Sequence, residues 1–331
     1  MKVFPKRWSL LFGIIALQTT ASFAQSGWTR QESGTTYTLN SVSFVDANTG
    51  TAVGGHGTIL RTTDGGDTWT QQESGTTAIL YGVSFADAKT GTAVGEGGLI
   101  LRTTDGGETW TRQQSGWSWG MTDVYVVDAD RATAVDANRI FQTSDGGDTW
   151  TVLAPDPFRV TDTLYRVSFA DANHGMAVGS RISHPITRYN ALVARTDDGG
   201  ASWSRIATGP AITLHALASA GADTWFAAGH VGGGTTEIYR STDFGQTWTS
   251  QYVANAGVQS ISFGDAKTGT AVGFTVPARG LIVRTIDGGD TWTEQESGTT
   301  AFLTSVSCVD ANTGTAVGDS GIILRTTTGG E

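Results

Sequence analysis

Residues 41–69 read SVSFVDANTGTAVGGHGTILRTTDGGDTW, and residues 82–110 repeat them almost letter for letter as GVSFADAKTGTAVGEGGLILRTTDGGETW. The aspartate of the glycine-rich turn recurs, at intervals of 40 to 53 residues, as Asp64, Asp105, Asp145, Asp198, Asp243 and Asp287. A tryptophan recurs in step with it, once per unit, as Trp28, Trp69, Trp110, Trp150, Trp203, Trp248 and Trp292. Seven units of about forty residues, each too small to bury its own faces, predict a closed repeat array.

Each unit carries the pattern of four antiparallel strands. In the second unit, short runs at residues 83–85, 92–94, 100–103 and 109–111 are separated by glycine-rich turns, as expected for strands in a meander. Four strands per unit of this length form one propeller blade. A leucine-rich or helical solenoid is the alternative, but no helical period of 3.6 residues appears after residue 25. The prediction is an all-β fold, a seven-bladed β-propeller of four-stranded antiparallel blades.

The two ends of the chain carry the two halves of one unit. Residues 325–331 hold the first half of the turn motif, and residues 27–34 hold the segment that follows it elsewhere. We therefore expect the N-terminal strand to join the C-terminal blade and close the ring, because closure removes open strand edges.

The composition narrows the classes of function. The chain has 331 residues, with 45 Gly, 6 Pro and 38% hydrophobic residues, which is enough to bury a core. Cys308 is the single cysteine and the five histidines are scattered, so we predict no disulfide, no metal centre and no cofactor. A formal net charge of -10 argues against nucleic-acid binding, because no excess positive field replaces phosphate counterions.

The first 24 residues have the composition of a secretory signal peptide. Lys2, Lys6 and Arg7 precede an apolar run at residues 10–17 and a small-residue end at residues 21–24. The run is too short to span a bilayer, although a membrane-anchored N-terminal helix is the alternative. We expect a signal peptide at 1–24 and a single propeller at 25–331, exported to a periplasm, a lumen or the medium as a soluble monomer.

The turn motif resembles a known repeat. The run Ser/Thr-x-Asp-Gly-Gly-x-Thr-Trp, seen for example at residues 62–69 and 103–110, is similar to the Asp-box, or BNR repeat, of sialidase-like propellers. Together with the first-strand and Ala-Val-Gly consensus, it most resembles the photosystem II stability and assembly factor family of lumenal propellers. The resemblance covers nearly all of residues 27–331 and implies an exported protein that binds a protein partner.

The repeated aspartates are interpreted as structural. An aspartate at the head of a tight turn accepts hydrogen bonds from the amides of that turn, and its glycines supply positive φ. The tryptophan is expected to fill the seam between blades. Calcium binding and acid/base catalysis are the alternatives, but near-identical copies cannot all be one active site, and the spacing lacks the run of oxygen ligands of a calcium loop.

The loops of one face interrupt the repeat, and we expect the site there. In a four-stranded meander the first and third loops share one face, here called the turn face, and the other loops share the second face. Departures from the repeat gather in second-face loops of one arc, as they do where function is added to a scaffold. Arginine with aromatic side chains suits an anionic or aromatic partner; solvated loop residues are the alternative interpretation. The predicted partner-binding residues are Arg159, Arg181, Arg188, Arg279, Trp117, Trp119, Phe158, Tyr189 and His184.

Three functions of different class remain open from the sequence. The first is a non-catalytic assembly or stability factor that binds a protein partner or a membrane-protein complex. The second is a carbohydrate-active enzyme, a glycoside hydrolase or polysaccharide lyase, acting on a glycan. For a hydrolase, only residues 157–160 are similar to the sialidase arginine motif, and a lyase would use His184, Tyr189 and Arg188. The third is a surface or matrix module without a single site.

Overall fold

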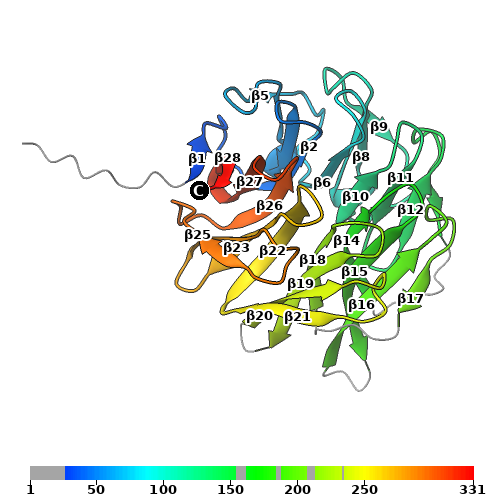
Figure 1. Ribbon diagram of the computed structural model, residues 1–331. Coiled ribbons are helices and arrows are strands. Elements are labelled where there is room, and N and C mark those ends of the chain that lie inside the picture. The colour runs from blue at the N-terminus through cyan, green and yellow to red at the C-terminus, as the bar shows by residue number, and fades with distance from the viewer. Residues whose placement is uncertain (1–26, 154–161, 184–187, 207–212, 233–234) are drawn as a thin grey trace, which may run out of the picture.

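The computed structural model describes residues 27–153, 162–183, 188–206, 213–232 and 235–331. These residues form seven four-stranded antiparallel sheets arranged as blades around a ring (Figure 1). The prediction of a seven-bladed all-β propeller is confirmed. Helical structure in the described residues is confined to three short 3-10 turns, η1 (Gly55–Gly57), η2 (Glu96–Gly98) and η3 (Asp319–Gly321). None of the described helices has the length and apolar character needed to cross a membrane.

The blades follow one another in chain order, with the strands numbered from the central channel outward in blades 1 to 6. Blades 1 to 3 are β2 (Leu39–Phe44), β3 (Gly50–Gly54), β4 (Ile59–Thr62), β5 (Thr70–Gln71); β6 (Leu80–Phe85), β7 (Gly91–Gly95), β8 (Ile100–Thr103), β9 (Thr111–Gln113); and β10 (Asp123–Val126), β11 (Ala132–Val135), β12 (Ile140–Thr143), β13 (Thr151–Val152). Blades 4 to 6 are β14 (Asp162–Phe169), β15 (Gly175–Ser183), β16 (Arg188–Thr196), β17 (Ser204–Ile206); β18 (Thr213–Ser219), β19 (Trp225–Gly232), β20 (Thr235–Ser241), β21 (Thr249–Ala254); and β22 (Ala256–Phe263), β23 (Gly269–Thr275), β24 (Arg279–Thr285), β25 (Thr293–Gln295). Blade 7 is β26 (Leu303–Cys308), β27 (Gly314–Gly318), β28 (Ile323–Gly330) and β1 (Gly27–Gln31).

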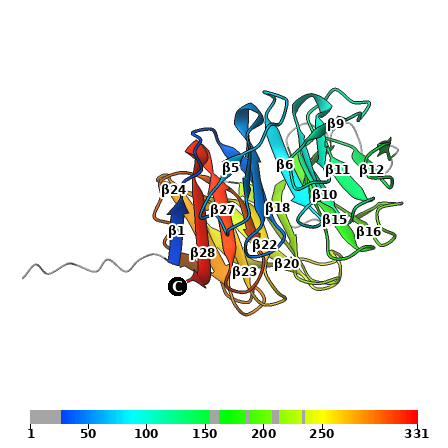
Figure 2. The ribbon, with the colours of Figure 1, turned by 90° about the horizontal axis from the view of Figure 1, so that it is seen from above.

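The ring is closed by the N-terminal strand, as predicted. Strand β1 pairs antiparallel with β28, with Arg30 opposite Leu324 and Gln31 opposite Ile323, so the first and last described strands lie side by side (Figure 2). Trp28 is 2% exposed and packs in one cluster with Val272 of blade 6. This strand therefore completes blade 7 and fills its seam with blade 6.

Tryptophan and glutamine link neighbouring blades in the regular part of the ring. The Trp69 indole Nε1 donates to Gln31 Oε1 of the preceding outer strand at 3.2 Å, and Gln31 Nε2 donates to the Gly65 carbonyl at 3.1 Å. The same indole-to-glutamine bond joins Trp110 to Gln72, Trp150 to Gln113 and Trp28 to Gln295. Each outer strand is thereby tied to the turn of the next blade.

The first strand of every blade lines the central channel. These strands contact one another in sequence, from β2 to β6 and onward, and β26 contacts β2. In the regular blades, channel-side serines accept hydrogen bonds from backbone N–H groups of the next first strand: Ser41 from Val83, and Ser305 from Val42, both at 3.3 Å. The channel wall is thus held together by repeated polar contacts between blades.

Blades 4, 5 and 6 are taller than the others. Strands β15 and β16 have 9 residues each, whereas the matching β3 and β4 of blade 1 have 5 and 4. The added residues lie at the second-face end, where β15 continues past Gly179, the counterpart of Gly54, to Ser183. Blades 4 to 6 therefore form a raised wall on one side of the second face.

Candidate functional site

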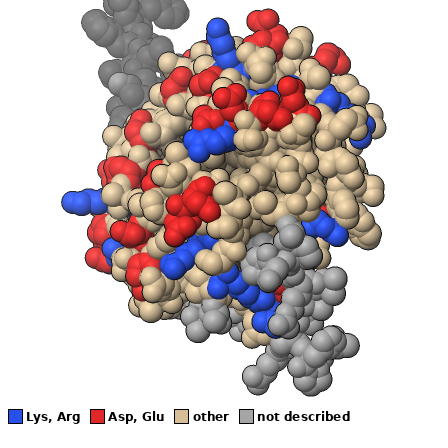
Figure 3. All heavy atoms as spheres, turned by 90° about the vertical axis from the view of Figure 1, so that its right-hand side faces the viewer, with Lys and Arg blue, Asp and Glu red and all other residues tan. Residues whose placement is uncertain are grey.

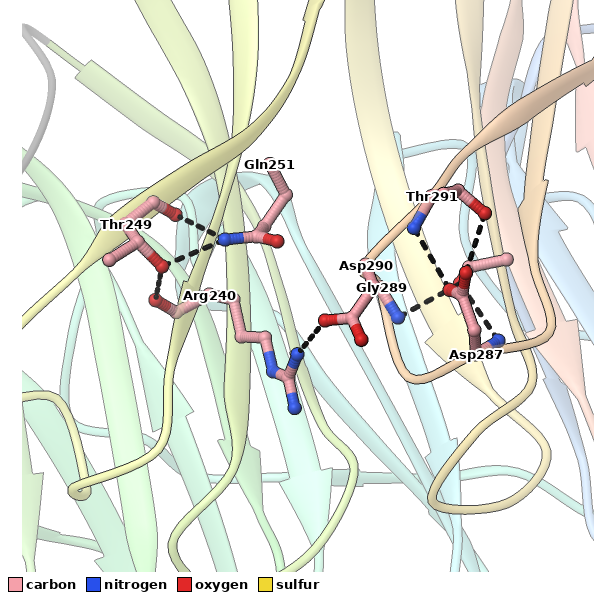
Figure 4. Close-up of polar contacts among 8 residues, drawn as sticks. Arg240, Thr249, Gln251, Asp287, Gly289, Asp290 and Thr291 are labelled. Atoms are coloured by element: carbon pink, nitrogen blue, oxygen red, sulfur yellow. Dashed lines mark hydrogen bonds and ion pairs between the residues drawn. The ribbon is translucent and has the colours of Figure 1, made fainter.

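The aspartate turns use their carboxylates within the turn itself. Asp64 accepts hydrogen bonds from the Thr62 hydroxyl at 2.8 Å, the Thr68 amide at 3.0 Å and the Thr68 hydroxyl at 2.6 Å. Bonds from the Thr68 side chain and amide lower the pKa of Asp64 to about 2. Asp287 makes the matching bonds with Thr285 and Thr291 (Figure 4). With both oxygens engaged, these carboxylates stabilise turns and are poorly placed to act on a ligand.

Arginines on the third strands of every blade but blade 3 tie that blade to the next. Arg61 donates from Nη1 to the Thr51 hydroxyl at 2.9 Å and from Nη2 to the Ala88 carbonyl of blade 2 at 2.5 Å. Its guanidinium lies 5.1 Å from the Phe85 ring centre. Arg102 and Arg325 make the same pair of hydrogen bonds, to a threonine hydroxyl of their own blade and to a carbonyl of the next. Arg240 forms an ion pair with Asp290 of blade 6 at 2.6 Å (Figure 4). These arginines are structural, and the sequence analysis did not identify them.

The faces follow the parity of the meander. On the turn face, the Gly65 amide of an aspartate turn donates to the Asn48 carbonyl of a first loop at 2.9 Å. On the second face, the Gly57 amide donates to the Ala78 carbonyl at 2.9 Å, which joins a loop between second and third strands to a loop between blades. The six predicted partner-binding residues that the structure describes belong to second-face loops or to the adjoining strand ends: Trp117, Trp119, Arg181, Arg188, Tyr189 and Arg279.

The two predicted tryptophans occupy one loop before blade 3. The Trp119 side chain is 70% exposed, whereas Trp117 is half-buried beneath the Arg139 guanidinium, which lies 3.7 Å from its ring centre. Arg139 also lies 3.6 Å from the buried Asp136 carboxylate. Trp119 is therefore free to contact a partner, and Trp117 holds the loop.

The predicted arginines differ in their surroundings. Arg181 is half-buried on β15, and its Nε makes no hydrogen bond within the described part of the chain. Arg279 on β24 is paired with Glu294, and lies 3.8 Å from Glu296, so its charge is already compensated. Arg188 and Tyr189 lie on β16. Arg159, Phe158 and His184 lie outside the described residues.

Positive charge is scattered over the side of the ring at the right of Figure 1. Figure 3 shows basic and acidic side chains interspersed there, with no broad field of one sign. This distribution fits the net charge of -10. A basic binding site on this side of the molecule would therefore be local.

A ring of seven matching residues surrounds the second-face mouth of the channel, and the sequence analysis missed it. In six blades the residue is skipped by the pairing of the first two strands, as a β-bulge, and Thr122 holds the position in blade 3. The ring consists of Asn40, Tyr81, Thr122, Tyr165, His215, Gln259 and Thr304. Bulges commonly re-aim side chains near functional sites. The sequence held one indication of this ring. When the seven units are aligned, the residue at this position differs from unit to unit, whereas the residue before it is leucine in most of them.

An open pocket of about 280 Å³ lies at this mouth. Arg166 lines it together with six residues of the ring: Asn40, Tyr81, Thr122, Tyr165, Gln259 and Thr304. Arg166 follows the bulge of blade 4 at a channel position that Ser41, Ser260 and Ser305 hold elsewhere. Asp123 holds the same position in blade 3 and accepts a hydrogen bond from the Val167 amide at 3.0 Å. Burial raises the pKa of the Asp123 carboxyl, and the charge of Arg166 opposes that rise.

Two histidines extend the polar mouth toward blade 5. The rings of Tyr165 and His215 lie 5.0 Å apart, and those of His215 and His230 lie 5.3 Å apart. Burial, with the charges of His230 and Arg166, lowers the pKa of His215 to about 4, so it is neutral at pH 7. In the described ranges, no three His, Cys, Asp or Glu side chains are grouped closely enough to hold a metal ion.

The fold and its repeated turns define the class: a single-ring, seven-bladed propeller with its irregular loops on one face. The family model described as photosynthesis system II assembly factor YCF48 matches residues 20–161. Together with the solved structures below, this match confirms the resemblance predicted from the sequence. No curated protein matches the chain.

Solved structures of YCF48 have the same fold. A structure described as YCF48 bound to D1 peptide is 21% identical with a TM-score of 0.70, over 92% of this chain and 98% of that one. YCF48 from Cyanidioschyzon merolae is 20% identical with a TM-score of 0.69, over 90% of this chain and 98% of that one. The GH74 xyloglucanase from Xanthomonas campestris is 14% identical with a TM-score of 0.70, over 92% of this chain and 54% of that one.

Proposed function

We propose that this protein is an exported, non-catalytic propeller that binds a segment of a protein partner as an assembly or stability factor. The observation that carries the proposal is the YCF48 family match, joined to a YCF48 structure of the same fold that was solved with a peptide. The irregular second face is the proposed binding surface, because rigid repeats commonly add function through variable loops.

The proposal includes export and a monomeric state. Residues 1–24 have the signal-peptide pattern, and we propose that their removal leaves a soluble propeller beginning near Gln25. We also infer that the aspartate turns are Asp-boxes with a structural role, because their carboxylates bond to their own turns. An intact-mass measurement of exported material tests the first point; retention of Lys2 would contradict it.

A carbohydrate-active enzyme is the alternative, and the fold similarity to a xyloglucanase favours it. This chain covers 54% of that enzyme, so the likeness shows a shared propeller fold. A lyase built on His184, Tyr189 and Arg188 remains the specific version of this alternative. We expect no product from any polysaccharide in a cleavage screen, and turnover that is lost in Tyr189→Phe would support the enzyme instead.

The direct test is capture of the partner from the native host. The mature chain is used as bait, beside a variant with Arg159, Arg181 and Arg188 changed to Glu. A control variant carries the same charge change at exposed residues away from the second-face mouth, Arg30, Lys89 and Arg112. We expect one membrane-associated or exported protein to be retained by the native chain and the control and lost by the second-face variant. Equal retention by all three baits would contradict the proposed surface.

A further inference from the structure

The channel mouth combines a small pocket with one charged lining residue. Among the described residues that line it, Arg166 is the only charged side chain. A volume of about 280 Å³ is near the lower end of the range for small-molecule sites. The pocket therefore suits a single side chain or a small acid better than a folded segment.

Most hydroxyl and amide donors around the pocket already have acceptors. The Thr122 hydroxyl donates to the Leu164 carbonyl at 3.0 Å, and the Thr304 hydroxyl donates to the Val317 carbonyl at 3.1 Å. Asn40 Nδ2 donates to the Leu80 carbonyl at 2.8 Å. These bonds hold the rim in place, and among the described lining residues Arg166 is the one charged donor for an incoming ligand.

The Arg166 guanidinium has spare capacity. It donates from Nη1 to the Tyr165 carbonyl at 3.0 Å. No carboxylate oxygen of the described residues lies within 4.0 Å of its nitrogen atoms, the distance limit for an ion pair. Asp123 is near enough to feel its charge without meeting that distance. A guanidinium presents five N–H donors in a planar fork that matches the two oxygens of a carboxylate.

We infer that the channel mouth binds one carboxylate, with Arg166 as its anchor and the Tyr81 and Tyr165 rings as its apolar sides. This inference rests on the proposed function, in which the carboxylate is an acidic side chain of the partner segment. Arg166 lies on β14 of blade 4, so the mouth adjoins the raised wall of blades 4 to 6, against which we place the partner segment. A free small organic acid offers the same chemistry, and the test separates the two sources.

The test uses defined probes with the full mature chain. One arm titrates the acetylated, amidated peptide Ala-Ala-Glu-Ala-Ala against its glutamine counterpart, and a second arm titrates free glutarate. Binding is followed by NMR through the side-chain Nε–H signal of Arg166. We expect the glutamate peptide to bind at least about tenfold more tightly than the glutamine peptide, because a charged hydrogen-bonded pair is lost in the latter. Stronger binding of glutarate than of the peptide would support the pocket and assign it to a free acid.

Matched variants make the result specific. Arg166→Gln should weaken the glutamate peptide by about tenfold or more, whereas Arg112→Gln on the exposed outer strand β9 should leave it unchanged. Asp123→Asn should tighten binding severalfold, because it removes the competing carboxylate while its side-chain oxygen still accepts the Val167 amide. Circular dichroism and melting temperature confirm that each variant is folded.

Two results would overturn the inference. One is equal binding of the glutamate and glutamine peptides, and the other is unchanged binding in a folded Arg166→Gln variant. The captured partner separates the two proposals. If it binds Arg166→Gln normally yet fails to bind the Arg159, Arg181 and Arg188 variant, the proposed function stands and the inferred carboxylate site at the channel mouth is wrong. If neither variant affects the partner but the glutamate peptide still depends on Arg166, the pocket stands and the proposed surface is wrong.

Discussion

The loop between the second and third strands has one structure in blades 1, 2 and 7 and another in blades 4, 5 and 6. In the first group a short 3-10 turn folds down onto the next inter-blade loop: the Gly98 Cα has a φ of +70, and a Cβ there would lie 2.1 Å from the Trp117 carbonyl oxygen. In the second group the second strand instead extends further at its second-face end. The regular blades therefore use this face for packing. Among the tall blades, blade 6 keeps one such contact, in which the Gly280 amide donates to the Thr299 carbonyl at 3.0 Å.

The same contrast holds for arginine. In the regular blades Arg61, Arg102 and Arg325 bond to backbone and threonine groups of the ring and are structural. In blade 4, Arg166 holds the position of Ser41 in blade 1 and Ser305 in blade 7, and no carboxylate of the described residues forms an ion pair with it. An arginine count alone would treat these residues as equal, and only their contacts separate scaffold from candidate site.

The largest expected effect is loss of ring closure. Deletion of residues 27–32 removes β1 and takes the buried Trp28 out of the seam between blades 6 and 7. Burial of one tryptophan is typically worth about 3 to 5 kcal/mol, so we expect the melting temperature to fall by about 10 °C or more. A truncated protein that melts within a degree or two of the native chain would show that the closing strand is dispensable.

The packing of the regular second face predicts the next effect. Gly98→Ala and Gly97→Ala both place a side chain at positive φ, but the Gly97 Cβ would meet nothing within 4 Å. The Gly98 variant should therefore lose about 1 to 3 kcal/mol more in free energy of unfolding, the usual range for overpacking. Urea denaturation of the two variants measures the difference. Equal stabilities would show that the turn at Gly98 is not closely packed against the next loop.

The aspartate turns predict a smaller effect on stability and none on binding. Asp105→Ala removes the bonds from the Thr103 hydroxyl and from the Thr109 amide and hydroxyl. We expect a drop of a few degrees in melting temperature and unchanged partner affinity, as in an exposed structural turn. Loss of binding in this folded variant would move the functional surface to the turn face.

Protonation of the same aspartate turns should lower the stability of the protein in acid. The carboxyls of Asp64, Asp105, Asp145 and Asp287 have a pKa of about 2, lowered mainly by bonds from the threonine four residues on. Because the folded pKa lies below the unfolded value near 4, their stabilisation is complete above about pH 4 and is lost as the pH falls toward 2. Melting curves across this range should show the decline, and Asp105→Asn should reduce its slope.

The sequence predicted the ring because its signals are local and repeated. Seven tryptophans in step and the split motif at the chain ends determine blade number and closure without any long-range information. The sequence did not reveal the channel mouth, because Tyr165 and Arg166 belong to a first strand that was interpreted only as scaffold. The convergence of the mouth residues depends on bulges in the first strands and on the closed ring. The ion pairs of Arg279 with Glu294 and Glu296 likewise depend on strand register, which residue type alone does not give.

The most direct test of the division between scaffold and site is the affinity of the captured partner for two variants of equal charge change. One carries Arg159, Arg181 and Arg188 changed to Glu on the second face, and the other carries Arg30, Lys89 and Arg112 changed to Glu. Titrations at low and high salt separate screened charge contacts from packing. We expect the first variant to keep its melting temperature and to lose binding by at least about a hundredfold, and the second to bind like the native chain. Equal affinities for the two variants, or loss of binding in the second alone, would contradict the division between scaffold and site.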